Sequence, residues 1–252
     1  MTLHRSLLLS LLFIAGCSPT GNAAAPPSVG SPERGDAAGP AACMAAVIQD
    51  LHLAWPNNRT INIVAFGHSV PAGFGVTPAV HKQDAYPRLL ENALADAYPN
   101  ALLNVITSAV GGEDSTQGLS RFQHDVLDHH PRVILIDYAL NDRALPLEAS
   151  ERNLSSMVDA ARAAGACPVL LTPTWDEHAH PERSDDPLRR QADMIHRLAA
   201  RTHVPVADSF AMFQAYKGDR NALMAQFNHP NRRGHELVLA ALLPLFMTGP
   251  AS

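Results

Sequence analysis

The stretch Val-Ile-Leu-Ile-Asp-Tyr at residues 133–138 is a short, continuous apolar run. A strand that is apolar at every position, instead of at alternate positions, is typical of a parallel sheet with both faces covered. Four other short runs predict strands of the same sheet. They are residues 61–66, 102–106, 169–172 and 204–207.

Segments with helical periodicity fill the intervals between these runs. In residues 86–97, for example, Leu89, Leu90 and Leu94 lie on one helical face. The other predicted helices are residues 119–127, 148–164, 188–201 and 234–246. The alternation predicts an α/β fold with a five-stranded parallel sheet and helices on both faces. In such sheets ligands bind beyond the carboxyl ends of the strands.

The composition fits a globular chain that does not bind nucleic acid. Of 252 residues, 46% are hydrophobic and 17% are charged, which is enough apolar material for a sizeable core. The formal net charge of −5 does not give the basic field that nucleic-acid binding needs. The cysteines and histidines show no zinc-type spacing.

The N-terminus has the pattern of an export signal. His4 and Arg5 precede an apolar run at residues 7–14, which is too short to cross a bilayer. The following Ile-Ala-Gly-Cys, which ends at Cys17, resembles a bacterial lipobox. This implies a signal peptide at residues 1–16 and a lipidated Cys17 that anchors the chain to the cell envelope. Ser18 resembles the sorting residue of outer-membrane lipoproteins. The alternative is an ordinary signal peptide with an incidental cysteine.

Residues 17–42 predict a flexible tether and residues 43–252 a single domain. Alanine, proline, glycine and serine dominate the first segment, which has too few large apolar residues to form a core. Cys43 and Cys167 then remain in the domain. In an exported chain they either pair as a disulfide, or Cys167 stays a buried free thiol.

Four polar blocks follow or adjoin the predicted strand ends. They are Gly-His-Ser-Val-Pro-Ala-Gly at residues 67–73, Ser-Ala-Val-Gly-Gly-Glu-Asp-Ser at 108–115, Ala-Leu-Asn-Asp at 139–142 and Asn-His-Pro-Asn at 228–231. Their order and placement resemble the SGNH hydrolases, the GDSL-type esterases and lipases, over about residues 60–245. The resemblance implies a flavodoxin-like three-layer sandwich.

The resemblance also implies a site for acyl transfer. Ser69 corresponds to the nucleophile, and His229 to the general base that takes its proton. The backbone N–H groups of Ser69 and Gly112, with the side-chain amide of Asn141, correspond to the oxyanion hole. This chemistry uses side chains and backbone alone, so no cofactor and no metal are expected.

The chain departs from the family pattern at two positions. His68 stands where the family has Asp in Gly-Asp-Ser, and it either supports the turn or contacts substrate. Gln226 stands three residues before His229, where the family places the Asp that orients the base. The orienting group is then a backbone carbonyl, the amide oxygen of Gln226, or a carboxylate from elsewhere such as Asp176.

Other polar residues near the strand ends have structural interpretations. Asp142, beside Asn141, is expected to steady the oxyanion loop. The segment Asp-Glu-His-Ala-His at residues 176–180 has elements of a metal site, but a polar loop near the substrate is the simpler interpretation.

The sequence therefore predicts an exported, lipid-anchored serine esterase. Its expected substrates are small acyl esters, foremost acetyl esters, of envelope or extracellular carbohydrate. Transfer of the acyl group to a sugar hydroxyl would use the same residues. The alternative of a different class is a catalytically silent glycan-binding lipoprotein on the same scaffold.

Overall fold

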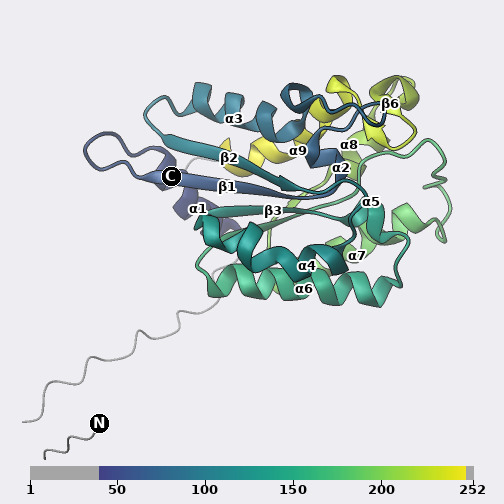
Figure 1. The fold of residues 1–252 in the computed structure, drawn as a ribbon, viewed down its shortest axis with the longest axis horizontal. Coiled ribbons are helices and arrows are strands. Elements are labelled where there is room, and N and C mark those ends of the chain that lie inside the picture. The colour runs from purple at the N-terminus through teal and green to yellow at the C-terminus, as the bar shows by residue number, and fades with distance from the viewer. Residues whose placement is uncertain (1–39, 248–252) are drawn as a thin grey trace, which may run out of the picture. The chain divides into compact units, whose positions relative to one another are not determined.

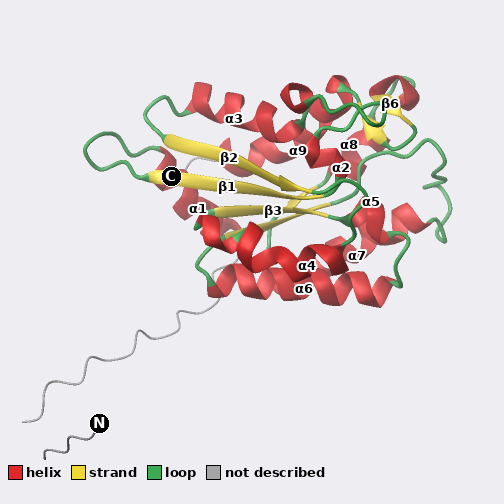
Figure 2. Ribbon diagram, viewed as in Figure 1, coloured by secondary structure: helices red, strands yellow, loops and turns green. Residues whose placement is uncertain are grey.

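The computed structural model describes residues 40–247, which form an α/β sandwich (Figures 1 and 2). The predicted signal peptide, the lipidated Cys17 and residues 18–39 of the predicted tether lie outside the described residues. Within residues 40–247, no helix is both long enough and apolar enough to cross a membrane.

A five-stranded sheet forms the centre of the fold. Its strands lie in the order β2-β1-β3-β4-β5, and all neighbouring pairs are parallel. The strands are β1 (Thr60–Gly67), β2 (Leu102–Ala109), β3 (Val133–Asp137), β4 (Cys167–Leu171) and β5 (Val206–Ala207). The predicted fold class and all five predicted strands are confirmed.

Both faces of the sheet are buried, which explains the continuous apolar runs. In β1, Ile63 belongs to one hydrophobic cluster and Val64 to the other. The first cluster lies against α1 (Pro40–Leu51), α3 (Tyr86–Ala97), α8 (Ser209–Ala215) and α9 (Arg232–Met247). The second lies against α4 (Ser115–Asp125), α6 (Leu147–Ala163) and much of α7 (Pro187–Thr202). Figure 1 shows α3 and α9 above the sheet, and α4 and α6 below it.

The sequence pattern does not predict α1, whose residues 40–42 fall within the predicted tether. This helix is covalently joined to the sheet, because Cys43 forms a disulfide with Cys167 at the start of β4. Of the two alternatives for these cysteines, the structure has the disulfide.

The shortest elements are also not predicted from the sequence, because they span too few residues to show a periodic pattern. They are α2 (Ser69–Ala72), α5 (Ala139–Asp142), a two-stranded hairpin of β6 (Met224–Gln226) and β7 (His229–Pro230), and three 3₁₀ helices, η1 (Lys82–Asp84), η2 (Leu127–His129) and η3 (Arg220–Leu223). Two of them, α2 and α5, directly follow the carboxyl ends of β1 and β3. The polar blocks of the sequence therefore meet at one edge of the sheet.

Candidate active site

Ser69 begins helix α2, immediately beyond the end of β1. The preceding residue, His68, caps this helix by accepting a hydrogen bond on Nδ1 from the backbone N–H of Val70. The Ser69 hydroxyl is mostly buried and lies 2.9 Å from Nε2 of His229, within hydrogen-bond distance. Residues 160 positions apart in the sequence thus form the pair that nucleophilic catalysis needs.

The second ring nitrogen of His229 faces a backbone oxygen. Nδ1 lies 2.9 Å from the carbonyl oxygen of Gly75, which can only accept a hydrogen bond. The proton of a neutral His229 therefore resides on Nδ1, and Nε2 is free to accept the Ser69 hydroxyl proton. The sequence leaves three candidates for the group that orients His229. In the structure this group is a backbone carbonyl, that of Gly75.

Neither of the other two candidates hydrogen-bonds to the His229 ring, whose nitrogens face Gly75 and Ser69. The Gln226 amide oxygen accepts hydrogen bonds from the backbone N–H and the hydroxyl of Thr77, at 2.8 and 2.9 Å. Asp176 is buried and forms ion pairs with Arg143 at 2.6 Å and His178 at 3.3 Å. Asp176 therefore anchors its own loop instead of orienting the base.

Gly112 and Asn141 lie beside the Ser69–His229 pair. Gly112 has a φ of +80°, a backbone conformation that favours glycine. The Asn141 amide donates one N–H to the carbonyl oxygen of Glu113 at 2.9 Å. Because a carbonyl can only accept, this bond fixes the orientation of the amide and leaves its second N–H for another acceptor.

Buried polar contacts hold Asn141 and its neighbours in place. The carboxylate of Asp142 accepts hydrogen bonds from the Ser115 backbone N–H at 2.8 Å and the Ser150 hydroxyl at 2.6 Å. Burial raises the pKa of Asp142. These contacts join α4, α5 and α6, so Asp142 supports the loop and does not face substrate.

The side chain of Glu113 forms a second buried network. It accepts hydrogen bonds from the Arg121 guanidinium at 2.6 to 3.0 Å and from the Tyr138 hydroxyl at 2.7 Å. The backbone of Glu113 holds Asn141, so this network fixes the position of the amide donor.

His68, which caps α2, is completely buried beside Ser69. Its Nδ1 is 3.5 Å from the Ser69 hydroxyl, and its Nε2 is 3.7 Å from a carboxylate oxygen of Asp137. Burial lowers the pKa of His68 to about 3, with smaller contributions from His229 and Arg143. Burial also raises the pKa of Asp137 to about 7. His68 is therefore neutral at physiological pH and is shielded from solvent.

A pocket of about 370 Å³ brings the candidate residues together. This volume is at the small end of the range for ligand sites. We call it the catalytic pocket, and its polar lining residues are Ser69, Thr77, Asn141, Gln226, Asn228 and His229. Gly111, Gly112, Phe74 and Phe227 complete the wall.

The loop at residues 176–180 borders a different hollow. Asp176 and His178 line a pocket of about 230 Å³, which Phe227 separates from the catalytic pocket. Among residues 40–247, no three His, Cys, Asp or Glu side chains are grouped so that they could hold a metal ion.

Two features of the site have no signature in the sequence. Any residue offers a backbone carbonyl, so the Gly75 oxygen has no sequence signature. Phe74 packs its ring against Gly111 and lies 5.9 Å from the His229 ring, yet a single aromatic residue in a loop does not indicate a site wall.

Comparisons with known proteins identify the family and support the fold. A family model described as the GDSL-like lipase/acylhydrolase family matches residues 65–237. Among solved structures, the acetylxylan esterase Axe2 from Geobacillus stearothermophilus has a similar fold, with a TM-score of 0.64 and 20% identity. That match covers 75% of this chain and 94% of Axe2.

Two curated proteins match shorter segments. An uncharacterized lipoprotein, YqeF of Bacillus subtilis, is 31% identical over 78 residues, which are 28% of this chain and 32% of YqeF. A thioesterase 1/protease 1/lysophospholipase L1 of Escherichia coli is 26% identical over 111 residues, which are 43% of this chain and 49% of that protein. The chain therefore spans about half or less of the length of these relatives.

Proposed function

The chain belongs to the GDSL-like lipase/acylhydrolase family, and we propose that it is a serine esterase that releases small acyl groups, foremost acetyl, from carbohydrate esters. The observation that carries this proposal is the 2.9 Å contact between the Ser69 hydroxyl and Nε2 of His229. The hydrogen bond from His229 to the Gly75 carbonyl supports it, because that bond leaves Nε2 unprotonated and able to act as a base.

The proposed mechanism assigns each chemical step to a residue that lines the catalytic pocket. His229 takes the hydroxyl proton while the Ser69 oxygen attacks the ester carbonyl, and the carbonyl oxygen becomes an oxyanion. The backbone N–H groups of Ser69 and Gly112 and the free amide N–H of Asn141 stabilise that oxyanion. His229 then protonates the departing alcohol. Water attacks the acyl-serine by the same path and releases the acid.

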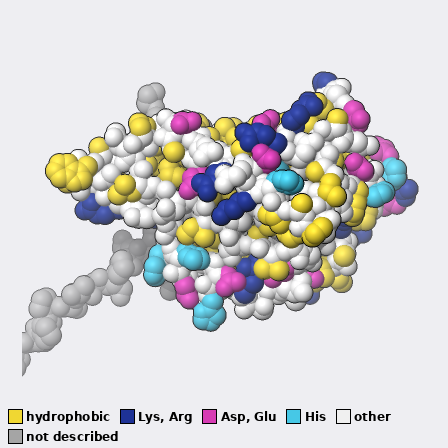
Figure 3. Space-filling view, turned by 45° about the horizontal axis from the view of Figure 1, so that its top comes forward, with side chains coloured by type: hydrophobic (Ala, Val, Ile, Leu, Met, Phe, Trp, Pro, Cys, Tyr) yellow, Lys and Arg dark blue, Asp and Glu magenta, His cyan; other side chains and the backbone are white. Residues whose placement is uncertain are grey.

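Several observations favour a small acyl group on a neutral carbohydrate. The catalytic pocket is small, and the matched solved structure is titled an acetylxylan esterase. In Figure 3, basic and acidic side chains lie interspersed on the face in view, without a large patch of one sign among the described residues there. A surface of this kind does not select for strongly charged ligands.

The protein acts at the cell envelope, held by acyl chains on Cys17. The lipobox resemblance at residues 14–17 and the similarity to a protein named a lipoprotein support this location. The disulfide between Cys43 and Cys167 supports an oxidising compartment. Metabolic labelling with radioactive palmitate tests the lipid anchor. The wild type should take up label, and Cys17→Ser should not. Equal labelling of both proteins would contradict the anchor.

Activity is tested with 4-nitrophenyl acetate and the full chain, with Ser69→Ala at equal concentration. We expect turnover in the wild type and its loss in the variant. An organophosphonate ester should also label wild-type Ser69 and leave Ser69→Ala unlabelled. Equal hydrolysis by both proteins, with no labelling, would favour the glycan-binding alternative. Acyl transfer to an added sugar, at the expense of acetate release, would assign the chain to the acyltransferases.

A further inference from the structure

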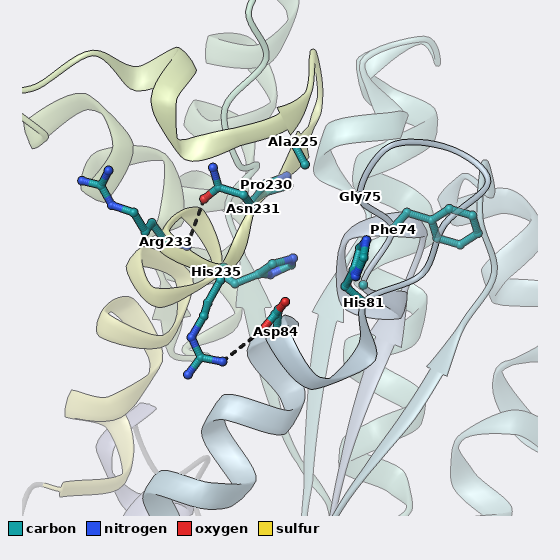
Figure 4. A pocket seen from close by; sticks show the side chains of 11 residues that line it. Phe74, Gly75, His81, Asp84, Ala225, Pro230, Asn231, Arg233 and His235 are labelled. Carbon is teal, nitrogen blue, oxygen red and sulfur yellow. Dashed lines mark hydrogen bonds and ion pairs between the residues drawn. The ribbon is translucent and has the colours of Figure 1, made fainter.

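A second pocket, of about 360 Å³, lies on the other side of the segment Phe74–Gly75 from the catalytic pocket. We call it the second pocket. Figure 4 shows side chains from three parts of the chain around it, the loop and 3₁₀ helix after α2, the β6–β7 hairpin, and the first turn of α9. Its polar lining includes His81, Asp84, Asn231, Arg232, Arg233 and His235.

His235 supplies a buried hydrogen-bond donor to this pocket. Only 2% of the residue is exposed, and its Nδ1 accepts a hydrogen bond from the backbone N–H of Tyr86 at 3.3 Å. Burial lowers the pKa of His235 to about 3, so its single proton is on Nε2. Nε2 has no hydrogen-bond partner among residues 40–247, and the ring extends into the space beside Asp84 in Figure 4.

Asp84 and Arg232 add acceptors and donors without a net charge. Their side chains form an ion pair at 3.0 Å, and Arg232 also pairs with Glu236 at 3.2 Å. The second carboxylate oxygen of Asp84 has no partner in the described part of the chain. A third charged side chain of the pocket, Arg233, donates a hydrogen bond to the Tyr216 hydroxyl at 2.8 Å. Asp84 disfavours an anion, and the two arginines disfavour a cation. The groups fit adjacent hydroxyls of a neutral ligand, one donating to Asp84 and one accepting from His235.

The second pocket is connected to the catalytic residues. Phe74 lines both pockets, and its ring is turned away from the second pocket in Figure 4. Gly75, which also lines the second pocket, holds His229 through its carbonyl oxygen. A chain-like ligand with its ester at Ser69 therefore reaches the second pocket by crossing the segment Phe74–Gly75.

From these contacts we infer that the second pocket is a subsite for a neutral sugar residue of the same glycan whose acyl ester lies at Ser69. This inference rests on the proposed esterase function and names its substrate as an oligosaccharide instead of a single sugar. The recognised chemistry is a pair of neighbouring hydroxyl groups, bound by Asp84, Arg232 and His235.

Binding without turnover tests the subsite. The full chain with Ser69→Ala is titrated by calorimetry with xylotriose, cellotriose, mannotriose and chitotriose. We expect at least one of them to bind, and Asp84→Ala in the same background to weaken that binding about tenfold, the effect of losing one or two hydrogen bonds to a charged group. Asp84 is half exposed on a 3₁₀ helix, so its replacement leaves the core intact.

The matched control is Asp128→Ala. Asp128 is likewise an exposed acid on a 3₁₀ helix with one ion pair, to His124, and it does not line either pocket. This variant should bind the trisaccharide as tightly as its parent. Absence of binding for all four trisaccharides, or equal weakening by both substitutions, would overturn the subsite. Failure of the esterase proposal is seen separately, as absent turnover of 4-nitrophenyl acetate by the wild type.

Discussion

Nδ1 of His229 lies 2.9 Å from the carbonyl oxygen of Gly75, in the place that a carboxylate fills in a Ser-His-Asp triad. A carbonyl dipole orients the imidazole and fixes its tautomer, as a carboxylate does. It carries no full negative charge, so it stabilises the imidazolium less. The protonation of His229 should therefore respond strongly to any charge introduced beside it.

Gln226→Glu introduces a negative charge at the position where the family usually has the Asp that orients the base. Gln226 pairs with His229 across the β6–β7 hairpin, and Glu keeps an oxygen that accepts from Thr77. A negative charge beside the ring stabilises the imidazolium, so the neutral base is lost at a higher pH. The acidic limb of the kcat/KM profile should therefore move to higher pH, by about half a unit to one unit. Gln214→Glu, at an exposed position on α8, should leave the profile unchanged. A shift to lower pH in Gln226→Glu would contradict this role of local charge.

Asn141→Ala should lower kcat by about 10²–10³ and change KM little, because an oxyanion donor acts on the transition state. Asn153 provides the comparison. Its amide also donates hydrogen bonds to α4, at Ser115 and Thr116, but it does not line the catalytic pocket. Steady-state kinetics of both alanine variants separate the effects. Equal losses in the two would show that Asn141 acts through the fold.

Gly112→Ala should lower both stability and activity. The φ of +80° costs a non-glycine residue about 1 kcal/mol, although no atom lies within 4 Å of the added Cβ. Gly165, at the end of α6, has a φ of +77° and equally open space, so Gly165→Ala carries the same backbone cost far from Ser69. Thermal unfolding should show similar destabilisation of both variants, while kcat should fall only in Gly112→Ala. Unchanged kcat in Gly112→Ala would show that the glycine-specific backbone conformation at residue 112 is not needed for catalysis.

Acid should destabilise the protein through two buried histidines. The pKa values of His68 and His235 are about 3 in the folded chain and 6.5 unfolded, so below pH 6.5 the unfolded chain binds protons that the folded chain does not. Asp137 acts in the opposite direction. Its folded pKa of about 7 exceeds the unfolded 3.8, so the folded chain holds one extra proton between those values.

Asp137→Asn removes that opposing effect. Between about pH 4 and 6.5, its free energy of unfolding should fall more steeply on acidification than that of the wild type, by about 1.4 kcal/mol per pH unit. Urea denaturation at pH 4.5, 5.5 and 6.5 measures both slopes. Parallel slopes would mean that Asp137 is already ionised in this range.

The sequence and the structure agree where side-chain type carries the information. Continuous apolar runs predict the five strands, and the four polar blocks predict which residues share a pocket, because parallel strands end at one edge. Features that depend on backbone atoms or on very short elements are not predicted from the sequence. The Gly75 oxygen orients His229, and the β6–β7 hairpin that presents His229 is too short for a periodic pattern. The sequence leaves two roles open for His68; the hydrogen bond that it accepts from the Val70 N–H shows that it caps α2, and its complete burial shields it from substrate.

The disulfide between Cys43 and Cys167 determines which element of the domain first bears a mechanical force applied to the chain before Cys43. Cys167 begins β4, which is bonded to strands on both sides, at β3 and β5. A pull on the chain ahead of Cys43 is therefore transmitted through the sulfur atoms to an interior strand, without first peeling α1 from the surface. Rupture by such a force would require the sheet itself to shear, whereas after reduction of the disulfide the same force would act first on the packing of α1 against the core.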